Sequence, residues 1–321
     1  MKPLLPPTPL TRWLVASWLC LAVAPAGAQS AAPTPLPQVS SGRIERLAEL
    51  PSRHVAARHV DVWLPPGYSP DKRYAVLYMH DGQNLFDGRL SFGGKAWNVH
   101  EALSRLMQAG RVPDTLVVGI WNSGATRYAE YYPQQVLAYT DEATRREYVE
   151  QASLGKSLAD AYLRFIVEEL KPMIDRRYAT RPGPESTFVM GASMGGLISL
   201  YALTEHPQVF GGAAALSTHW VGKPTAWGLP RVRNAALPLA AMAYLMQRLP
   251  TGTRHRIYSD RGDDELDVLY DPAHRLFEEV LRDRGYGAVR AMTRVFPGTG
   301  HNEGHWAARL ELPLQFLLGP R

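Results

Sequence analysis

The chain has 321 residues, of which 45% are hydrophobic and 20% charged, and its formal net charge is +5. This composition excludes a disordered chain and a chain embedded in a membrane throughout, and it supplies enough apolar material for one large globular domain or two small ones. Because the sequence contains no long basic run, nucleic-acid binding has no support.

The first 28 residues have the pattern of a secretory signal peptide. Lys2 and Arg12 precede an apolar run from Trp13 to Ala24, and Ala26-Gly27-Ala28 forms a small-x-small cleavage site. The run is shorter than the roughly 20 residues that span a bilayer, so we expect cleavage after Ala28 rather than a stable membrane anchor. The predicted location is outside the cytoplasm, either periplasmic or secreted.

The only cysteine, Cys20, lies within this segment. The mature chain would therefore contain no disulfide, no thiol nucleophile and no cysteine-ligated metal. Residues 29–42 are rich in Ala, Pro and Ser without periodicity, which predicts a flexible leader outside the fold. Order should begin near Arg43, so the predicted domain covers residues 43–321.

Strand-like and helical patterns alternate along this domain. Residues 54–64 and 74–79 predict an antiparallel strand pair that enters a sheet. Helical patterns and strand-like runs follow, the helices over 99–107 and 157–174 and the strands over 115–120, 187–190, 213–217 and 256–259. Such alternation predicts a mostly parallel central sheet with helices on both faces. The segment 220–250 interrupts the alternation, either as a small lid or as an ordinary crossover.

Ser193 lies at a predicted turn between a buried strand and a helix. A serine there requires a strained backbone, and residues two before and two after it would approach so closely that both must be glycine, as Gly191 and Gly195 are. The unpaired N–H groups at the start of the helix would stabilise an oxyanion beside the hydroxyl. This pattern is typical of a nucleophile elbow.

The partners that would activate such a serine follow in the expected order, an acid and then a histidine. A strand over 254–260 leads into an acidic segment that contains Glu265 and Asp267, and a last strand over 292–296 leads to His301. From the residues alone, either carboxylate is a candidate for the acid.

Two metal hypotheses are less consistent with the sequence. His301-x-Glu303-x-His305 differs from the helical zinc pattern His-Glu-x-x-His, since Gly304 intervenes and a third ligand is missing. The acidic segment 260–267 lacks the glycine-spaced ligands of a calcium loop. We expect neither a metal nor a cofactor.

Four segments together resemble one family. They are His80-Asp81-Gly82-Gln83, Gly191-Ala-Ser193-Met-Gly195-Gly196, Leu266-Asp267, and Gly300-His301-Asn302-Glu303 with Trp306 and Arg309. From about residue 54 to its end, the chain is similar to the putative-esterase family of α/β-hydrolases, which includes enterochelin, feruloyl and acetyl-xylan esterases, S-formylglutathione hydrolases and mycolyltransferases.

The resemblance implies an α/β-hydrolase fold with Ser193 as nucleophile and His301 as general base. It also implies an oxyanion hole formed by the backbone N–H groups of Met194 and Gln83. By resemblance to members with a Gly-Thr-x-x-Leu-Asp run, Asp267 is the acid, with Glu265 as the alternative. The resemblance includes enterochelin-type esterases that work without the acid.

Trp97 and Arg127 follow sheet strands, where the substrate crevice of such a fold opens, so they are predicted either to contact substrate or to pack. The function expected is hydrolysis of a small-molecule or glycan ester by a serine esterase. There are two alternatives. One is an acyltransferase that uses the same acyl-enzyme, and the other is a non-catalytic exported binding protein of the same fold. The oligomeric state is not indicated.

Overall fold

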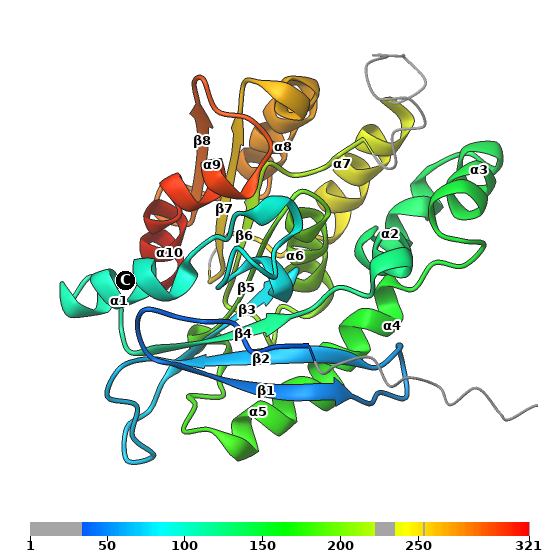
Figure 1. The fold of residues 1–321 in the computed structure, drawn as a ribbon. Coiled ribbons are helices and arrows are strands. Elements are labelled where there is room, and N and C mark those ends of the chain that lie inside the picture. The colour runs from blue at the N-terminus through cyan, green and yellow to red at the C-terminus, as the bar shows by residue number, and fades with distance from the viewer. Residues whose placement is uncertain (1–33, 222–234, 253, 321) are drawn as a thin grey trace, which may run out of the picture. The chain divides into compact units, whose positions relative to one another are not determined.

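An eight-stranded sheet organises the chain in the computed structural model, which describes residues 34–221, 235–252 and 254–320 (Figure 1). Its spatial order is β1-β2-β4-β3-β5-β6-β7-β8. The strands are β1 (Arg43–Leu50), β2 (Arg58–Leu64), β3 (Ala75–His80), β4 (Thr115–Ile120), β5 (Thr187–Ala192), β6 (Gly212–Leu216), β7 (Arg256–Gly262) and β8 (Ala291–Phe296). The predicted signal peptide over 1–28 lies outside the described residues.

Strands β3 to β8 pair in parallel, while β1 and β2 pair antiparallel. The predicted pairing of residues 54–64 with 74–79 is wrong, because β4 lies between β2 and β3. Every residue of β3 is buried, as expected of a strand covered on both faces, so β3 occupies a central position. Strand β1 was not predicted from sequence; it is an edge strand with only one buried residue, Leu47.

Helices cover both faces of the sheet, which confirms the predicted architecture. One core contains apolar residues of α1, α9 and α10 on one face, and a second core contains those of α2 to α8 on the other. The helices are α1 (Val99–Gln108), α2 (Arg127–Tyr131), α3 (Glu142–Ala152), α4 (Ala159–Arg164), α5 (Lys171–Arg177), α6 (Met194–Glu205), α7 (Ala236–Arg248), α8 (Asp271–Asp283), α9 (Glu303–Arg309) and α10 (Glu311–Leu318).

The helix predicted over 157–174 is interrupted. A π-helical segment, Phe165–Leu170, joins α4 to α5, so the backbone hydrogen bonds change register within one continuous helical stretch. Part of the predicted lid, residues 222–234, lies outside the described residues, and the rest of that segment contains α7.

The leader predicted over 29–42 extends too far at its C-terminal end. The chain divides into two compact units, Met1–Pro35 and Leu36–Arg321, so residues 36–42 belong to the unit that holds the sheet. Gln38 donates its backbone N–H to Asp87 at 2.9 Å, and Ser41 accepts from the Trp63 indole at 2.8 Å. Polar residues without periodicity are ordered here because the body of the domain supplies their hydrogen-bond partners.

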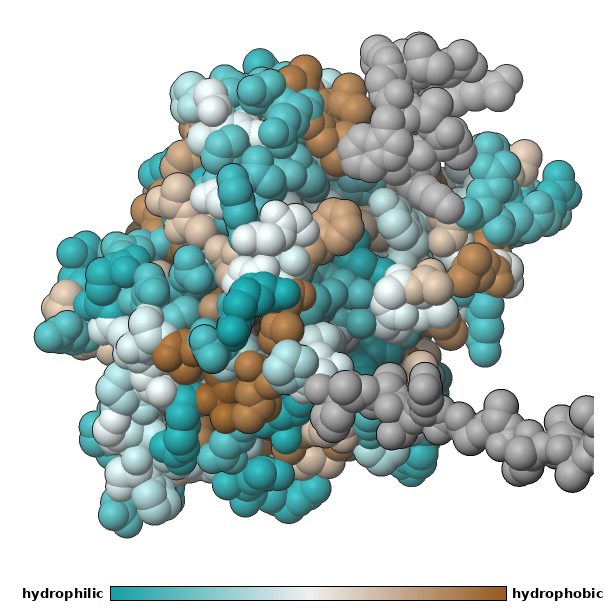
Figure 2. Space-filling view, in the orientation of Figure 1, coloured by the Kyte–Doolittle hydropathy of each residue, from teal (hydrophilic) through white to brown (hydrophobic). Residues whose placement is uncertain are grey.

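Hydrophilic residues cover most of the face seen in Figure 2, with apolar residues in small separate groups. Within the described ranges, no helix is both long enough and apolar enough to cross a membrane.

Candidate active site

Ser193 occupies the corner between β5 and α6 in a strained conformation. Its φ is 58° and its ψ is −125°, and its N–H donates to Leu216 at 2.9 Å. A Cβ on Gly191 would lie 2.6 Å from the carbonyl carbon of Gly195, so Gly191 cannot be replaced without a shift. A Cβ on Gly195 would meet only ordinary contacts at 3.4 Å, so the predicted clash applies to Gly191 alone.

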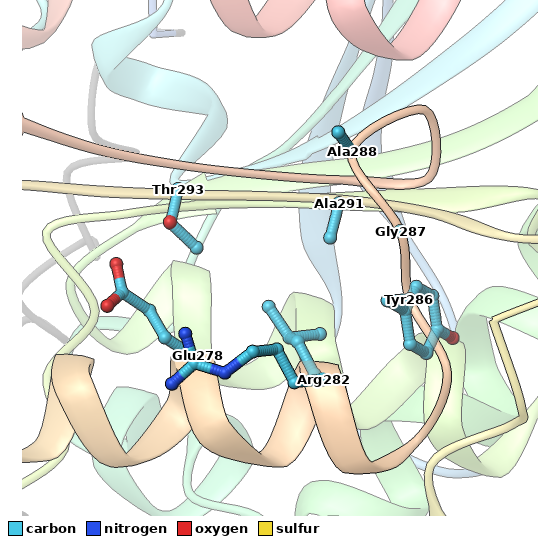
Figure 3. Close-up of a pocket in the computed structure, with 8 residues that line it drawn as sticks. Glu278, Arg282, Tyr286, Gly287, Ala288, Ala291 and Thr293 are labelled. Carbon is cyan, nitrogen blue, oxygen red and sulfur yellow. The ribbon is translucent and has the colours of Figure 1, made fainter.

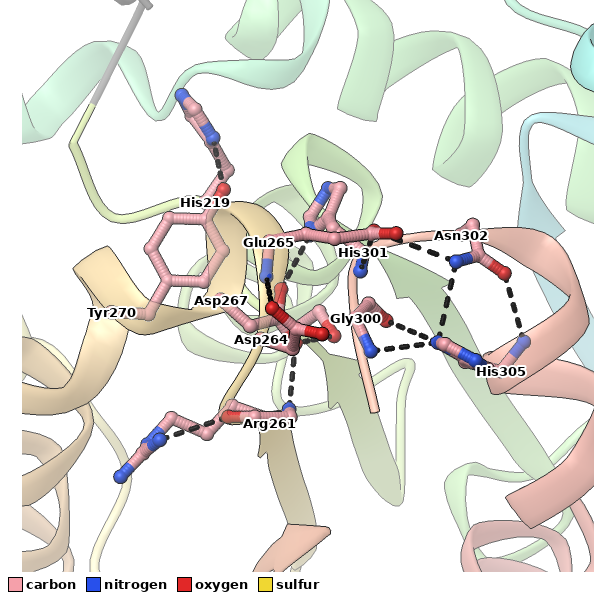
Figure 4. Close-up of polar contacts among 12 residues, drawn as sticks. His219, Arg261, Asp264, Glu265, Asp267, Tyr270, Gly300, His301, Asn302 and His305 are labelled. Carbon is pink, nitrogen blue, oxygen red and sulfur yellow. Dashed lines mark hydrogen bonds and ion pairs between the residues drawn. The ribbon is translucent and has the colours of Figure 1, made fainter. Parts of the chain in front are cut away.

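His301 lies in the loop before α9, with its ring bonded to a buried carboxylate. Asp267 Oδ1 lies 2.6 Å from His301 Nδ1, and Asp267 is fully buried (Figure 4). Glu265 instead accepts the backbone N–H of His301 at 2.7 Å. Of the two carboxylates that the sequence left open, Asp267 therefore contacts the ring, and Glu265 holds the loop.

The second oxygen of Asp267 is held as firmly as the first. Oδ2 accepts from the Ser217 hydroxyl at 2.5 Å and from the Gly262 N–H at 2.6 Å. Burial by itself would raise the pKa of Asp267. The hydrogen bond and charge of His301, together with the hydrogen bonds from Ser217 and Gly262, outweigh the effect of burial, so the pKa is lowered. Asp267 is therefore ionised at neutral pH.

Ser217 connects Asp267 to a buried ion pair that the sequence analysis missed. Its Oγ accepts from Trp306 Nε1 and Arg309 Nη2, both at 2.9 Å. Arg309 also binds both oxygens of Asp260, at 3.1 and 3.0 Å. Burial raises the pKa of Asp260 more than Arg309 lowers it. Ser217 and Asp260 lie at the ends of β6 and β7, whereas Arg309 was named from sequence only as part of the family resemblance.

Trp97 is buried rather than available to substrate. Only 4% of it is exposed, and its ring packs against Trp306 with 5.6 Å between centroids. Trp306 in turn contacts the His301 ring edge-on at 5.0 Å. The burial does not support the predicted substrate contact and places Trp97 behind the histidine.

The predicted oxyanion turn follows β3. Asp81 adopts φ 56° and ψ 48°, and a Cβ on Gly82 would lie 2.5 Å from the backbone of Gly119, so glycine is required there. Among the described residues, the N–H groups of Gln83 and Met194 have no hydrogen-bond acceptor. Both remain available to bind an oxyanion.

His80, predicted to pack beneath this turn, is buried with Nδ1 2.8 Å from the Tyr162 hydroxyl. Burial lowers the pKa of His80 to about 3, so its ring is neutral.

Arg127 binds a protein carboxylate in the structure. Its Nε and Nη2 donate to the two oxygens of Asp81 at 2.8 and 2.7 Å, and its guanidinium lies over the Tyr131 ring. Burial raises the pKa of Asp81, but Arg127 and Asn122 outweigh it and lower the pKa. No pattern in the sequence indicates this pair.

His219, also missed from sequence, links the elbow to the histidine loop. Its N–H donates to the Ser193 carbonyl at 3.1 Å, and its Nδ1 lies 2.6 Å from the Tyr270 hydroxyl. The Tyr270 ring contacts the His301 ring at 5.6 Å. Burial lowers the pKa of His219 to about 3, so this ring is neutral as well.

The residues of the His301-x-Glu303-x-His305 pattern have separate partners. His305 Nδ1 accepts from the Gly300 N–H at 2.6 Å, and Glu303 Oε1 accepts from Asn84 at 3.1 Å. In the part of the chain that the structure describes, no group of three or more His, Cys, Asp or Glu side chains is arranged to hold a metal ion.

A hollow of about 220 Å³ lies away from these residues, between α8 and β8 (Figure 3). It is lined by Glu278, Leu281, Arg282, Tyr286, Gly287, Ala288, Ala291 and Thr293. None of the predicted site residues contributes to it, so the Ser193 and His301 geometry, and not this hollow, locates the candidate site.

The sequence and the fold are both similar to those of known proteins. The sequence matches the family described as "Putative esterase" over residues 55–316. The Bacillus subtilis (strain 168) protein YbbA, described as uncharacterized, is 29% identical over 277 residues, which cover 84% of this chain and 96% of YbbA.

Two solved structures share the fold. A ferulic acid esterase has a TM-score of 0.60 at 19% identity, with 86% of this chain and 97% of the esterase covered. The enterobactin esterase FES of Shigella flexneri has a TM-score of 0.62 at 18% identity, with 88% of this chain and 60% of FES covered. The predicted α/β-hydrolase fold is confirmed.

Proposed function

The chain belongs to the family described as "Putative esterase" and is a carboxylic ester hydrolase, and we propose that Ser193, His301 and Asp267 perform the hydrolysis as a catalytic triad. The observation that carries this proposal is the 2.6 Å contact between His301 Nδ1 and the buried Asp267. It leaves Nε2 of the ring for the serine. The contacts through His219 and Tyr270 connect this ring to the Ser193 elbow.

The reaction divides into two transfers. Ser193 Oγ attacks the ester carbonyl carbon while its proton passes to His301 Nε2, and the oxyanion accepts hydrogen bonds from the N–H groups of Gln83 and Met194. The C–O bond to the alcohol then breaks, and the alcohol leaves with the proton from His301. Water attacks the acyl-enzyme, its proton again passes to His301, and release of the acid restores Ser193.

Ionised Asp267 keeps the Nδ1 proton of His301 in place and stabilises the imidazolium that forms in each transfer. The substrate proposed is an ester of a small molecule or of a glycan, met outside the cytoplasm. The structural relatives named above act on ferulic acid esters and enterobactin.

Hydrolysis of p-nitrophenyl acetate tests the nucleophile. Ser193→Ala should abolish turnover and leave the far-UV circular dichroism unchanged, because loss of a triad member costs several orders of magnitude in kcat. A variant with near wild-type turnover would refute the proposal.

The same assay separates the two carboxylates. Asp267→Asn should lower kcat about 10²-fold or more, since an amide nitrogen facing Nδ1 favours the wrong tautomer. Glu265→Gln keeps a side-chain carbonyl for the His301 N–H and should cost less than about tenfold. If Glu265→Gln is the more damaging change, Asp267 is not the catalytic acid.

A further inference from the structure

The Asp81–Arg127 ion pair lies beside the proposed oxyanion hole, and the triad does not use it. Asp81 immediately precedes Gly82 and Gln83, the turn that presents one oxyanion donor. Its Oδ2 lies 3.4 Å from the point that a Cβ on Gly195 would occupy, in the first turn of α6. A carboxylate therefore lies next to both elements that would bind the oxyanion.

An unpaired carboxylate at this place would oppose catalysis. Negative charge develops on the carbonyl oxygen in the transition state, and a neighbouring negative charge raises the energy of that state. Arg127 binds both oxygens of Asp81, at 2.8 and 2.7 Å, so the charge is neutralised by a bidentate pair. The side chains of Asp81 and Arg127 are only 14% and 22% exposed, which limits screening by solvent.

The same pair fixes the backbone of the turn. Asp81 has a left-handed conformation, which a non-glycine residue adopts only where its surroundings hold it. Asn122 donates its amide to Asp81 Oδ1 at 2.7 Å and its N–H to the Gln83 side chain at 3.2 Å. The Tyr131 hydroxyl accepts the Asp81 N–H at 3.3 Å. Because Arg127 and Tyr131 are four residues apart on α2, both face this turn.

Helix α2 has an independent anchor. Glu130 binds Arg58 of β2 through two hydrogen bonds of 2.8 Å, and both residues are almost completely buried. Loss of the Arg127 side chain should therefore leave α2 in place, so a variant at this position reports on the turn.

We propose that Arg127 is a positioning residue for ester hydrolysis. Its ion pair with Asp81 holds the Asp81–Gln83 turn and cancels a carboxylate charge that would otherwise oppose the oxyanion. This inference rests on the proposed function, since it requires an oxyanion formed beside Ser193. It replaces the predicted role of Arg127 as a substrate contact.

The test compares Arg127→Ala, Asp81→Asn/Arg127→Ala and wild type, with p-nitrophenyl acetate as substrate and butylboronic acid as an inhibitor that forms an anionic tetrahedral adduct. Arg127→Ala should lower kcat about 10²-fold, the usual cost of a lost oxyanion interaction, with KM changed less than about threefold. Affinity for the boronic acid should fall in parallel. The double variant should regain at least about tenfold in kcat over Arg127→Ala, because the unpaired charge is gone.

Arg53→Ala is the control, since Arg53 is 80% exposed and pairs with Glu169 at 3.0 Å, and neither residue belongs to the proposed site. It should leave kcat and KM unchanged.

Two results would overturn the inference. One is an Arg127→Ala enzyme with raised KM and wild-type kcat, which identifies a substrate contact. The other is a double variant no faster than Arg127→Ala.

If Arg127→Ala fails to fold, Arg127→Lys is the second variant, because it keeps the charge but loses the bidentate fork. Arg127→Lys should lower kcat and boronic-acid affinity together, and a wild-type kcat would refute the inference. Hydrolysis by Ser193→Ala would instead refute the proposed function itself, whereas an inactive Ser193→Ala beside an Arg127→Ala enzyme with wild-type kcat refutes the inference alone.

Discussion

Ser217 shows how a residue outside the triad determines the orientation of its acid. The hydroxyl donates one hydrogen bond to Asp267 and accepts one each from Trp306 and Arg309, so all three of its hydrogen-bonding positions are used. Its φ of 43° is unusual for serine and aims the side chain at this junction. Ser217 thereby holds Oδ2 of Asp267, the oxygen that does not contact His301.

Ser217→Ala should therefore harm both stability and activity. The change leaves two buried donors without their acceptor, which costs about 1–3 kcal/mol of the free energy of unfolding, and it removes one donor from Asp267. Ser259 is the matched control: it is buried on β7, and its hydroxyl has no partner among the described residues. Urea unfolding and p-nitrophenyl acetate kinetics should separate the two variants. Equal effects of Ser217→Ala and Ser259→Ala would contradict the role given to Ser217.

At the scale of elements, the elbow depends on how closely β5 and α6 approach at Ser193. Gly191 lies so close to the backbone of Gly195 that no side chain fits between them. Gly195 itself has room for a methyl group beside His80 and Asp81. The two glycines of the motif therefore have different physical roles.

This asymmetry is measurable. Gly191→Ala should reduce the free energy of unfolding by about 1–3 kcal/mol or more, because the added methyl group meets backbone that cannot move aside. Gly195→Ala should be neutral or slightly stabilising, because alanine is the better helix former in α6. Chemical denaturation of both variants tests this. A Gly195→Ala variant that is the less stable of the two would show that the elbow is packed differently.

The elements differ in how far sequence could predict them. Buried parallel strands such as β4 and β5 are continuous apolar runs, so their pattern was visible. The edge strand β1 buries one residue and has no such pattern. Strand order is a property of the whole chain, which explains why β2 was assigned to the wrong neighbour.

The residues of the site also divide into those that local sequence patterns indicate and those that only the folded chain brings together. Ser193 and His301 could be proposed because the elements that flank them are local features of the sequence, whereas the choice of Asp267 over Glu265 came from the family resemblance. The Asp81–Arg127 pair joins the turn after β3 to helix α2, which follows β4, and β3 and β4 are neighbours in the sheet. No sequence spacing indicates such a contact.

Across the whole chain, buried histidines link stability to pH. Burial lowers the pKa of His80 and His219 to about 3 and that of His274 to about 4. In the unfolded chain, each has a pKa of about 6.5. Above that pH both states are neutral; below it the unfolded state binds protons that the folded state does not, so stability falls as the pH falls toward the folded pKa.

We therefore expect the free energy of unfolding to decrease between pH 7.5 and 5.5, by up to about 1.4 kcal/mol per pH unit for each histidine. Denaturant unfolding at pH 7.5, 6.5 and 5.5 measures the slope. His274→Gln should reduce this slope, because glutamine cannot take up the proton that His274 binds in the unfolded chain. Equal stability at pH 7.5 and 5.5 would show that these histidines are not held neutral by the fold.

Labelling with a fluorophosphonate probe measures whether His301 and Asp267 activate Ser193, because only an activated serine reacts at an appreciable rate. Peptide mass spectrometry should find the adduct on Ser193 in the wild-type protein, no adduct in Ser193→Ala, and labelling slowed by orders of magnitude in His301→Ala. An unlabelled wild-type protein, or His301→Ala labelled at the wild-type rate, would show that His301 does not activate Ser193.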